Sequence, residues 1–125
     1  MSDKQIHFTT RVLGPVTTFR LEQCQVTQTL RSESDSVTNA ILNGQASAGD
    51  KLEITLDTIT VGMAELISMD AVIWGSLDIG DAHRGGFDNL DDLSEALKRA
   101  GYRFMTLNGY HLFRIQFSWL EEVYA

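Results

Sequence analysis

The stretch Val26-Thr27-Gln28-Thr29-Leu30-Arg31 alternates between two kinds of side chain, as a β-strand does. Successive side chains of a strand point to opposite faces, so Thr27, Thr29 and Arg31 share one face. Two hydroxyls and a guanidinium in a row suit an anionic or polar ligand. Threonine is also an ordinary strand residue, so the same pattern fits a plain solvated face. The neighbouring sequence decides between these two interpretations.

The bulk composition is that of an ordinary globular protein. The chain has 125 residues, enough for a single domain, 1–125, with one hydrophobic core. No run approaches the ~18 apolar residues of a membrane span, and the first residues lack the layout of a signal peptide. One cysteine, Cys24, excludes an internal disulfide framework and fits a reducing compartment. We therefore expect a cytoplasmic protein with no membrane partner.

The net charge of −7 argues against a protein that coats nucleic acid with its whole surface. A local basic patch remains compatible with this charge, because screening over about 8–10 Å separates a patch from distant acids. A nucleic-acid partner is therefore restricted to a local site.

The sequence before the opening stretch predicts little regular structure. Residues 4–9 alternate weakly and fit an entry strand, so residues 1–13 are either a peripheral strand or a flexible lead-in. Gly14-Pro15 predicts a turn. Residues 16–19 fit either a short strand or the start of a helical turn that runs through Glu22.

Residues 36–74 predict a short helix and two strands. Ser36 is a candidate N-cap for a helix over 37–42, which Asn43-Gly44 would end. Alternation over 51–56 predicts a half-buried strand, and Asp57-Thr58 fits a hairpin turn. The apolar stretch 59–74 exceeds the typical strand of about 5–6 residues, so it must bend, near Gly62 or Glu65. Its predicted apolar phase is Ile59, Val61 and Met63, resuming at Ile67, Met69, Ala71 and Ile73.

The last third of the chain predicts two helices and a closing strand. A helical turn over 79–84 ends at Gly85-Gly86, and a second helix begins at Asp88 or Asn89 and ends at Gly101. The buried stripe predicted for the second helix is Leu90, Leu93, Leu97 and Ala100. After the tight turn Asn108-Gly109, the closing strand points Phe113, Ile115, Phe117 and Trp119 inward and Arg114, Gln116 and Ser118 outward. A long bent strand among others indicates a small α+β barrel.

Residue types alone point to no catalytic or metal site. The histidines, His7, His83 and His111, do not pair at metal-ligand spacing, so we expect no metal and no other cofactor. There is no Gly-x-Ser-x-Gly elbow and no phosphate-binding glycine loop. Cys24 has no adjacent cation, and we expect it to be a buried or half-buried hydrophobe. The acid pairs, Asp91-Asp92 and Glu121-Glu122, fit a helix start and a solvated tail.

A basic surface with an aromatic neighbour is the remaining candidate for a binding site. It forms if the barrel brings the strand 26–31 beside the helical turn 77–87, and Tyr102, Arg103 or Phe104 would then supply a stacking group. The candidate ligand-binding residues are Arg20, Thr27, Thr29, Arg31, His83 and Arg84. An ion pair of Arg31 with Glu33 or Asp50 would argue against the site.

Segments of the chain, in this order, resemble the ASCH domain family, a group of small proteins related to the PUA β-barrel. Thr27–Arg31 is similar to the family's Lys-Thr-x-Thr-x-Arg strand, and Gly49–Ile54 to its Gly-Asp turn and strand. The range 77–97, with Asp81-Ala82 and Gly86-Phe87, is similar to its Asp-Ala-x-x-Glu-Gly-Phe helical segment. The closing strand 110–120 also fits. The resemblance implies a mixed, PUA-like barrel of about five to six strands with two or three short helices.

The same resemblance implies a cleft between the Thr-x-Thr-x-Arg strand and the helical turn, with an RNA- or nucleotide-related ligand. Some family members are amidohydrolases of acylated cytidine that use a lysine, a threonine and a glutamate. Thr29 matches the threonine, but Val26 replaces the lysine and Gly85 the glutamate. Valine and glycine supply neither a nucleophile nor a base.

We therefore expect an RNA- or nucleotide-binding module without the family's catalytic pair. One alternative is a small hydrolase, amidohydrolase or ribonuclease-like, that acts on a modified nucleoside or RNA, with a shifted alignment that places Glu22 or Asp81 in the cleft. Another is a protein-interaction domain that keeps the fold and uses its acidic surface and the outward face of the last strand for a protein partner.

Overall fold

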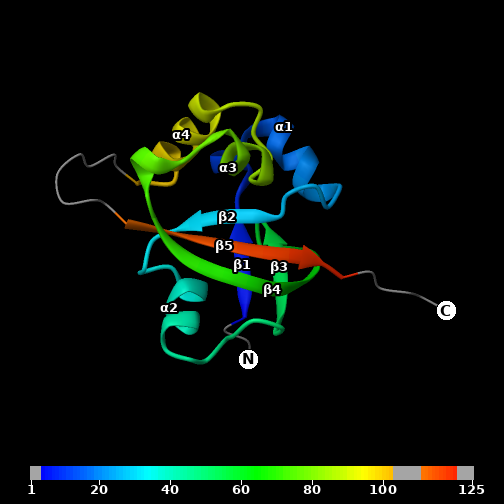
Figure 1. The fold of residues 1–125 in the computed structure, drawn as a ribbon. Helices are drawn as coiled ribbons and strands as arrows, with labels where there is room; N and C mark the ends of the chain where they lie inside the picture. Colours follow the sequence, from blue (N-terminus) through cyan, green and yellow to red (C-terminus); the bar gives the residue numbers. More distant parts are fainter. Residues whose placement is uncertain (1–3, 103–110, 121–125) are drawn as a thin grey trace.

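Five strands of the described chain form one curled sheet in the order β1-β3-β4-β5-β2, which leaves β1 and β2 as its free edges (Figure 1). The computed structural model describes residues 4–102 and 111–120. Its elements are β1 (Gln5–Phe8), α1 (Thr10–Glu22), β2 (Gln28–Arg31), α2 (Ser36–Leu42), β3 (Lys51–Leu56), β4 (Ile59–Ile73), a 3-10 turn (Trp74–Ser76), α3 (Ile79–Arg84), α4 (Leu90–Arg99) and β5 (His111–Trp119).

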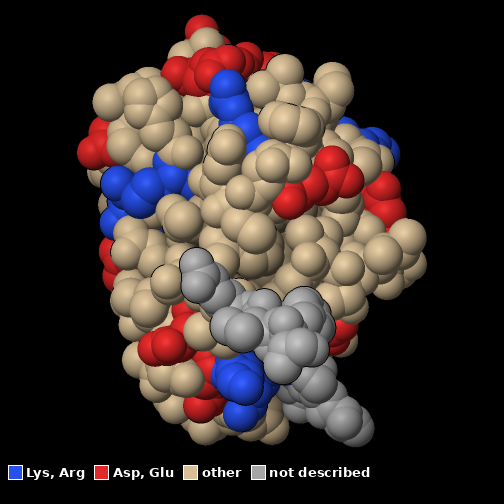
Figure 2. Space-filling view, turned by 90° about the vertical axis from the view of Figure 1, so that its right-hand side faces the viewer, with Lys and Arg blue, Asp and Glu red and all other residues tan. Residues whose placement is uncertain are grey.

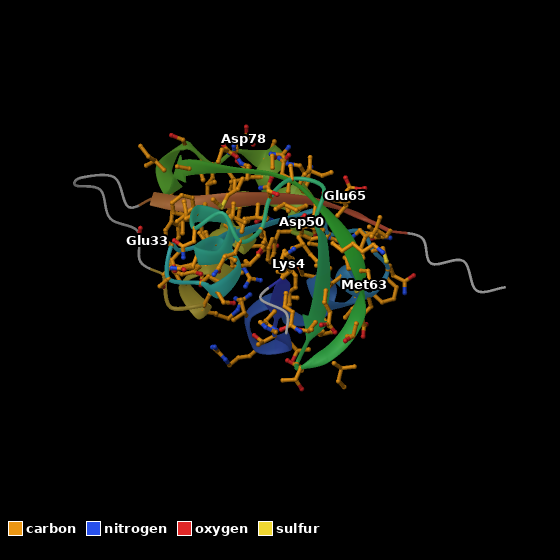
Figure 3. All side chains as sticks on the ribbon, turned by 90° about the horizontal axis from the view of Figure 1, so that it is seen from below. Lys4, Glu33, Asp50, Met63, Glu65 and Asp78 are labelled. Carbon is orange, nitrogen blue, oxygen red and sulfur yellow. The ribbon has the colours of Figure 1, made fainter. Side chains whose placement is uncertain are left out.

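The sheet is mixed. β1 runs parallel to β3, and the other neighbouring pairs are antiparallel. Residues 5–8 of the expected entry strand are therefore part of the sheet. Lys4 adds an ion pair of 3.3 Å to Asp50, just before β3 (Figure 3). Figure 1 shows β1 and β3 crossing behind β2 and β5, with α1, α3 and α4 on one side and α2 on the other. This arrangement confirms the predicted α+β, PUA-like barrel architecture.

The long strand β4 spans 15 residues and joins the two halves of the sheet, because it pairs with β3 along its first part and with β5 along the rest. Its ladder slips at two places, where Val61 and Ile67 are extra residues, each close to a predicted bend. The predicted apolar phase is wrong in both parts, since Ile67, Ala71 and Ile73 of the second part are exposed and Val72 is buried. In the first part, Ile59 is 72% exposed, and Ala64 and Leu66 are the buried residues. An extra residue moves every following side chain to the opposite face, which a regular alternation cannot anticipate.

The helices differ from the prediction mainly at α1. Gly14-Pro15 is a kink inside this helix, with Gly14 at φ 80°, and residues 16–19 are helical. α1 brings the number of α-helices in the described residues to four, where two or three were expected. Asp35, not Ser36, caps α2, and Asn89 caps α4. In α4 the buried residues are Leu93, Ala96 and Leu97, whereas Leu90 and Ala100 are exposed.

Two further expectations are wrong. Cys24 is exposed, because the chain reverses there with Cys24 at φ 60° and turns the side chain toward solvent. In β5, Ile115 and Phe117 are buried as predicted, but the expected outward residues Arg114 and Gln116 are half-buried beneath polar partners. The turn Asn108-Gly109, the side chain of His111 and the tail Glu121-Glu122 lie outside the described residues, as do Arg103 and Phe104.

None of the helices in residues 4–102 or 111–120 combines the length and the apolar character that a membrane crossing requires.

Candidate ligand pocket

A cavity of about 260 Å³ lies where the sheet is open, between the free edges β1 and β2. The start of α1 and the buried face of α4 cover it. Its wall is mainly apolar, with Phe8, Leu13, Leu30, Phe87, Leu93 and Leu97 among the lining residues. The polar lining residues are His7, Thr9, Arg11, Gln28, Thr29, Arg31, Asp35, Asp81 and Tyr102. An apolar pocket with a few converging polar groups is the usual form of a small-molecule site.

Arg31 closes the gap between the two edges of the sheet. Its Nε donates to Thr29 Oγ1 at 2.8 Å, and its Nη2 donates to the His7 carbonyl of β1 at 2.8 Å. Its Nη1 forms an ion pair with Asp35 Oδ2 at 3.1 Å. The guanidinium carbon also lies 4.9 Å from the centre of the Phe8 ring. All three nitrogens of Arg31 are therefore engaged within the protein.

The partner of Arg31 is fixed by the start of α2. Asp35 Oδ1 caps the helix by accepting from Val37 N at 3.2 Å, and Oδ2 faces Arg31. Glu33 and Asp50 were the expected competitors, but Asp50 pairs with Lys4 instead, and these two residues lie side by side in Figure 3. The acid that holds Arg31 thus differs from either one named from the sequence.

The strand β2 lies beside α3, as the candidate site required. Thr27 N donates to the Arg84 carbonyl at 2.9 Å. Thr29 and Arg31 line the cavity together, whereas Thr27, Arg84, His83 and Arg20 are not among its lining residues. His83 is exposed and its Nε2 lies 3.3 Å from the Asp88 carbonyl. Arg20 pairs with Asp88 at 2.8 Å and donates to the Gly86 carbonyl at 3.0 Å.

The sequence patterns did not predict a buried ionic cluster around Asp81, two members of which, Gln28 and Asp81, also line the cavity. Asp81, 1% exposed, accepts hydrogen bonds from Gln28, Arg84 and Arg114 at 2.9 Å each. Burial alone would raise the pKa of Asp81. The hydrogen bonds from Gln28, the Asp78 backbone and Arg114 outweigh it and hold the pKa at about 2. The signal for this cluster was Gln28, an amide on the strand's otherwise apolar face.

The same cluster explains why Arg114 and Gln116 do not face solvent. Arg114 also pairs with Asp70 at 3.0 Å, and Gln116 donates to Gln28 Oε1 at 3.1 Å. Burial would lower the pKa of Arg114, but hydrogen bonding and charge from Asp81 raise it. The cluster ties α3 to β2, β4 and β5, so its role is structural.

The two residues that the sequence resemblance aligns with the family's lysine and glutamate, Val26 and Gly85, are both described. Val26 is fully buried, and its Cγ2 would lie 2.8 Å from a Cβ built on Gly86. Gly85 lines the cavity but has no side chain. No group of three or more His, Cys, Asp or Glu residues in the described segments is arranged to hold a metal ion. The cavity wall in this part of the chain therefore offers hydrogen bonds and stacking surfaces.

One face of the molecule carries both positive and negative charges. Figure 2 shows Lys and Arg atoms lying next to Asp and Glu atoms, with broad uncharged areas between them. The printed ion pairs agree with this view, since Arg20, Arg31, Arg84 and Arg114 each pair with an aspartate.

Comparison with solved structures finds chains of similar fold, and two of them are as follows. One is the ASCH domain from Lactobacillus crispatus JV V101, with a TM-score of 0.59 and 14% identity over 83% of this chain and 69% of that chain. The chain has the fold of an ASCH domain. The other is a protein of Enterococcus faecalis V583 from the DUF984 family, with a TM-score of 0.51 and 16% identity over 81% of this chain and 67% of that chain. No protein-family model and no curated protein matches the sequence.

The likeness confirms the expected ASCH-type fold. Within that fold the cavity occupies the space beside the Thr-x-Thr-x-Arg strand, where the sequence resemblance had implied a cleft.

Proposed function

We propose that this ASCH-type domain binds RNA or a nucleotide in the cavity between β1 and β2 and catalyses no reaction there. The observation that carries the proposal is the shared wall of Thr29 and Arg31 in a cavity of about 260 Å³. Small-molecule sites start at about 300 Å³, so the space suits one planar group rather than a large ligand.

The chemistry of the wall fits a nucleobase. Thr29 Oγ1 accepts from Arg31 Nε, so its hydroxyl hydrogen can be donated to an acceptor on the ligand. Because the nitrogens of Arg31 are engaged in its own plane, its contact with a ligand runs through the guanidinium face opposite Phe8. Bases commonly stack on such planes and on aromatic rings, and Tyr102 supplies a ring in the same wall.

The other four candidate residues fall outside the cavity. His83 and Arg84 are exposed on α3 next to β2, so a longer RNA that leaves the cavity on this side would reach them. Two hydrogen bonds fix the backbone of the same region. Arg20 donates to the Gly86 carbonyl, and Thr27 N donates to the Arg84 carbonyl.

The proposed absence of catalysis rests on residues 26 and 85, which the resemblance aligns with the family's lysine and glutamate. A buried valine and a glycine cannot act as nucleophile, proton donor or general base. Of the two substitutes named from a shifted alignment, Glu22 is not among the lining residues of the cavity. Asp81 does line it, but its carboxylate pairs with two arginines and its pKa is about 2, which makes it a weak base.

The test is a fluorescence titration of short RNAs, nucleosides and nucleotides with three proteins: wild type, Thr29→Val and Thr27→Val. The two variants make the same change on one strand, but Thr29 lines the cavity and Thr27 does not. We expect Thr29→Val to weaken binding roughly tenfold, as expected for one lost hydrogen bond of about 1 kcal/mol or slightly more. Thr27→Val should bind as wild type does.

The rivals predict different results from the same samples. Equal binding by all three proteins, or none by any, contradicts the proposed pocket. Release of acetate from acetylcytidine would support the hydrolase. Co-purification of one protein partner with no nucleotide binding would favour an interaction domain, although the burial of Arg114 and Gln116 removes part of the surface expected for it.

A further inference from the structure

Two arginines stand apart from the charge pairing that engages the others. Six arginines lie in the described residues, and four of them pair with aspartates: Arg20, Arg31, Arg84 and Arg114. In the same segments, 4–102 and 111–120, neither Arg11 nor Arg99 forms an ion pair with an acid. Among the described arginines, these two are therefore the ones without an ion pair.

Arg11 and Arg99 are held together by reciprocal contacts between α1 and α4, which pack side by side (Figure 1). Arg11 Nη1 donates to the Arg99 carbonyl at 3.0 Å, and Arg99 Nε donates to the Val12 carbonyl at 2.9 Å. Each guanidinium thus uses one nitrogen for a described hydrogen bond. An arginine carries five N–H donors, so most donors of both residues remain for a ligand.

The kink in α1 lies next to this pair. Gly14 sits at φ 80°, and a Cβ built there would be in ordinary van der Waals contact with Arg99 Nη2, at 3.9 Å. Pro15 has no N–H, so the helical hydrogen-bond pattern is interrupted beside Val12, whose carbonyl receives Arg99. The pair is therefore positioned by local backbone geometry and not only by long flexible side chains.

Arg11 and Arg99 line two adjoining hollows. Arg11 lines the cavity between β1 and β2, and Ala100, next to Arg99, lines it too. Arg99 lines a neighbouring hollow of about 250 Å³ that shares Leu13 and Phe87 with the first and is also lined by Asp88, Asp92 and Glu95. Of these acids, Asp88 pairs with Arg20 and Glu95 with Lys98.

We propose that Arg11 and Arg99 bind the phosphate of a nucleoside phosphomonoester whose base occupies the cavity. Guanidinium groups match phosphate oxygens with paired hydrogen bonds, and two of them balance the two negative charges of a phosphomonoester. The proposal rests on the proposed function and narrows its ligand to a base with a terminal phosphate, either a free nucleotide or the phosphorylated end of an RNA. An uncharged nucleoside leaves the arginines unused.

The competing explanation is structural, because cations near a helix C-terminus stabilise its last carbonyls, and Arg11 does contact the Arg99 carbonyl. That role affects folding stability but gives no difference between a nucleoside and its phosphate.

The experiment compares the four ribonucleosides with their 5′-monophosphates, by titration against wild type, Arg11→Gln, Arg99→Gln and Lys98→Gln. Glutamine keeps an N–H donor for the backbone carbonyl and removes the charge. Lys98→Gln is the control, since it removes one exposed charge beside Arg99 that pairs with Glu95. We expect wild type and Lys98→Gln to prefer a monophosphate over its nucleoside by roughly ten- to a hundredfold, and both arginine variants to lose most of that preference. RNAs with and without a 5′-phosphate distinguish the two sources of the phosphate.

Several outcomes would overturn the proposal. If nucleosides bind but the phosphate adds nothing in wild type, the arginine pair is structural and the pocket stands. The same follows if Arg11→Gln and Arg99→Gln only lower thermal stability and keep the preference. If Arg11→Gln weakens nucleotide binding while Thr29→Val does not, the arginine site stands and the proposed pocket falls. If no nucleoside or monophosphate binds to wild type, both fall.

Discussion

Asp81 accepts the hydrogen bonds that allow several neighbouring polar side chains to be buried or half-buried. Its carboxylate receives Gln28 and two arginines inside the protein, and the Asp78 N–H donates to its Oδ2 at 3.0 Å. Asp81 N donates in turn to Asp78 Oδ1, which closes a capping box at the start of α3. Removing Asp81 leaves the guanidinium of Arg114, which is already half-buried, short of its main partner.

The pKa of Asp81 gives a prediction for stability against pH. Its pKa is about 2 in the folded protein and close to 3.8 when unfolded. A lowered folded pKa contributes stability above the unfolded value, and this contribution, about 2 kcal/mol, is lost as pH falls from about 4 to about 2. Urea unfolding of wild type and Asp81→Asn at pH 7, 4 and 2 measures it. The variant should be less stable at pH 7 by on the order of 3 kcal/mol and show a flatter pH dependence.

Asp70→Asn is the matched control for this prediction, because Asp70 pairs with the same arginine at the surface. We expect it to cost less than about 1 kcal/mol at pH 7. A similar loss for both aspartates would show that burial of the Asp81 cluster contributes little.

At the scale of elements, the turn that follows α3, at Gly85-Gly86, depends on the second of these glycines. Gly86 has φ +90°, and a Cβ there would lie 2.8 Å from Val26 and 3.0 Å from Thr17. Its carbonyl also accepts hydrogen bonds from Thr17 Oγ1 and Arg20 Nη1. The close approach of this loop to α1 and to residue 26 is therefore possible only without a side chain.

Substitution of two glycines separates backbone strain from crowding at this turn. Gly86 and Gly44 both have a positive φ, but a Cβ on Gly44 meets nothing within 4 Å. We expect Gly44→Ala to lower the free energy of unfolding by about 1 kcal/mol through strain alone. Gly86→Ala should cost a further 1–3 kcal/mol, roughly, because it overpacks Val26 and Thr17. Thermal or urea unfolding checks the difference, and equal costs would contradict the crowding.

The elements that were predicted correctly are those whose signals lie within a short stretch of sequence. Alternation gave β3, Asp57-Thr58 gave the hairpin, and the acidic start and basic end of α4 gave that helix. The kinked helix α1 was missed because Gly14-Pro15 reads as a turn, whereas the helix tolerates it as a break between two helical segments. The inner phase of β4 was missed because bulges reverse the alternation.

The sequence predicted which strand lines the candidate site, but it did not predict which side-chain groups are free to contact a ligand. Thr29 and Arg31 do line one cavity, since their spacing on β2 is local. Contacts between residues far apart in the sequence decide which arginine can bind a ligand. Arg20 pairs with Asp88, and Arg114 with Asp81, only once the fold is formed. Arg11, from a segment that the sequence left undefined, consequently escaped notice.

At the scale of the whole molecule, the sheet is a barrel that does not close by backbone hydrogen bonds. β1 and β2 are at opposite ends of the strand order, and Arg31 spans them with contacts to Thr29, His7, Phe8 and Asp35. The same opening forms the cavity. A side chain that joins the edges leaves more room beside it than a continuous ladder would. Arg31 therefore contributes both to the stability of the sheet and to the wall of the proposed binding cavity.

This arrangement predicts that Arg31 holds β1 in place. Arg31→Ala removes an ion pair, two hydrogen bonds and a stacking contact, and should lower the free energy of unfolding by about 3 kcal/mol. Amide hydrogen exchange should accelerate more in Gln5–Phe8 than in the central strands β4 and β5, because the free edge opens first. Lys98→Ala, which breaks an exposed pair with Glu95, is the control and should change stability by less than about 1 kcal/mol. Uniform acceleration across the sheet would contradict the role of Arg31, since a general loss of stability exposes central and edge strands alike.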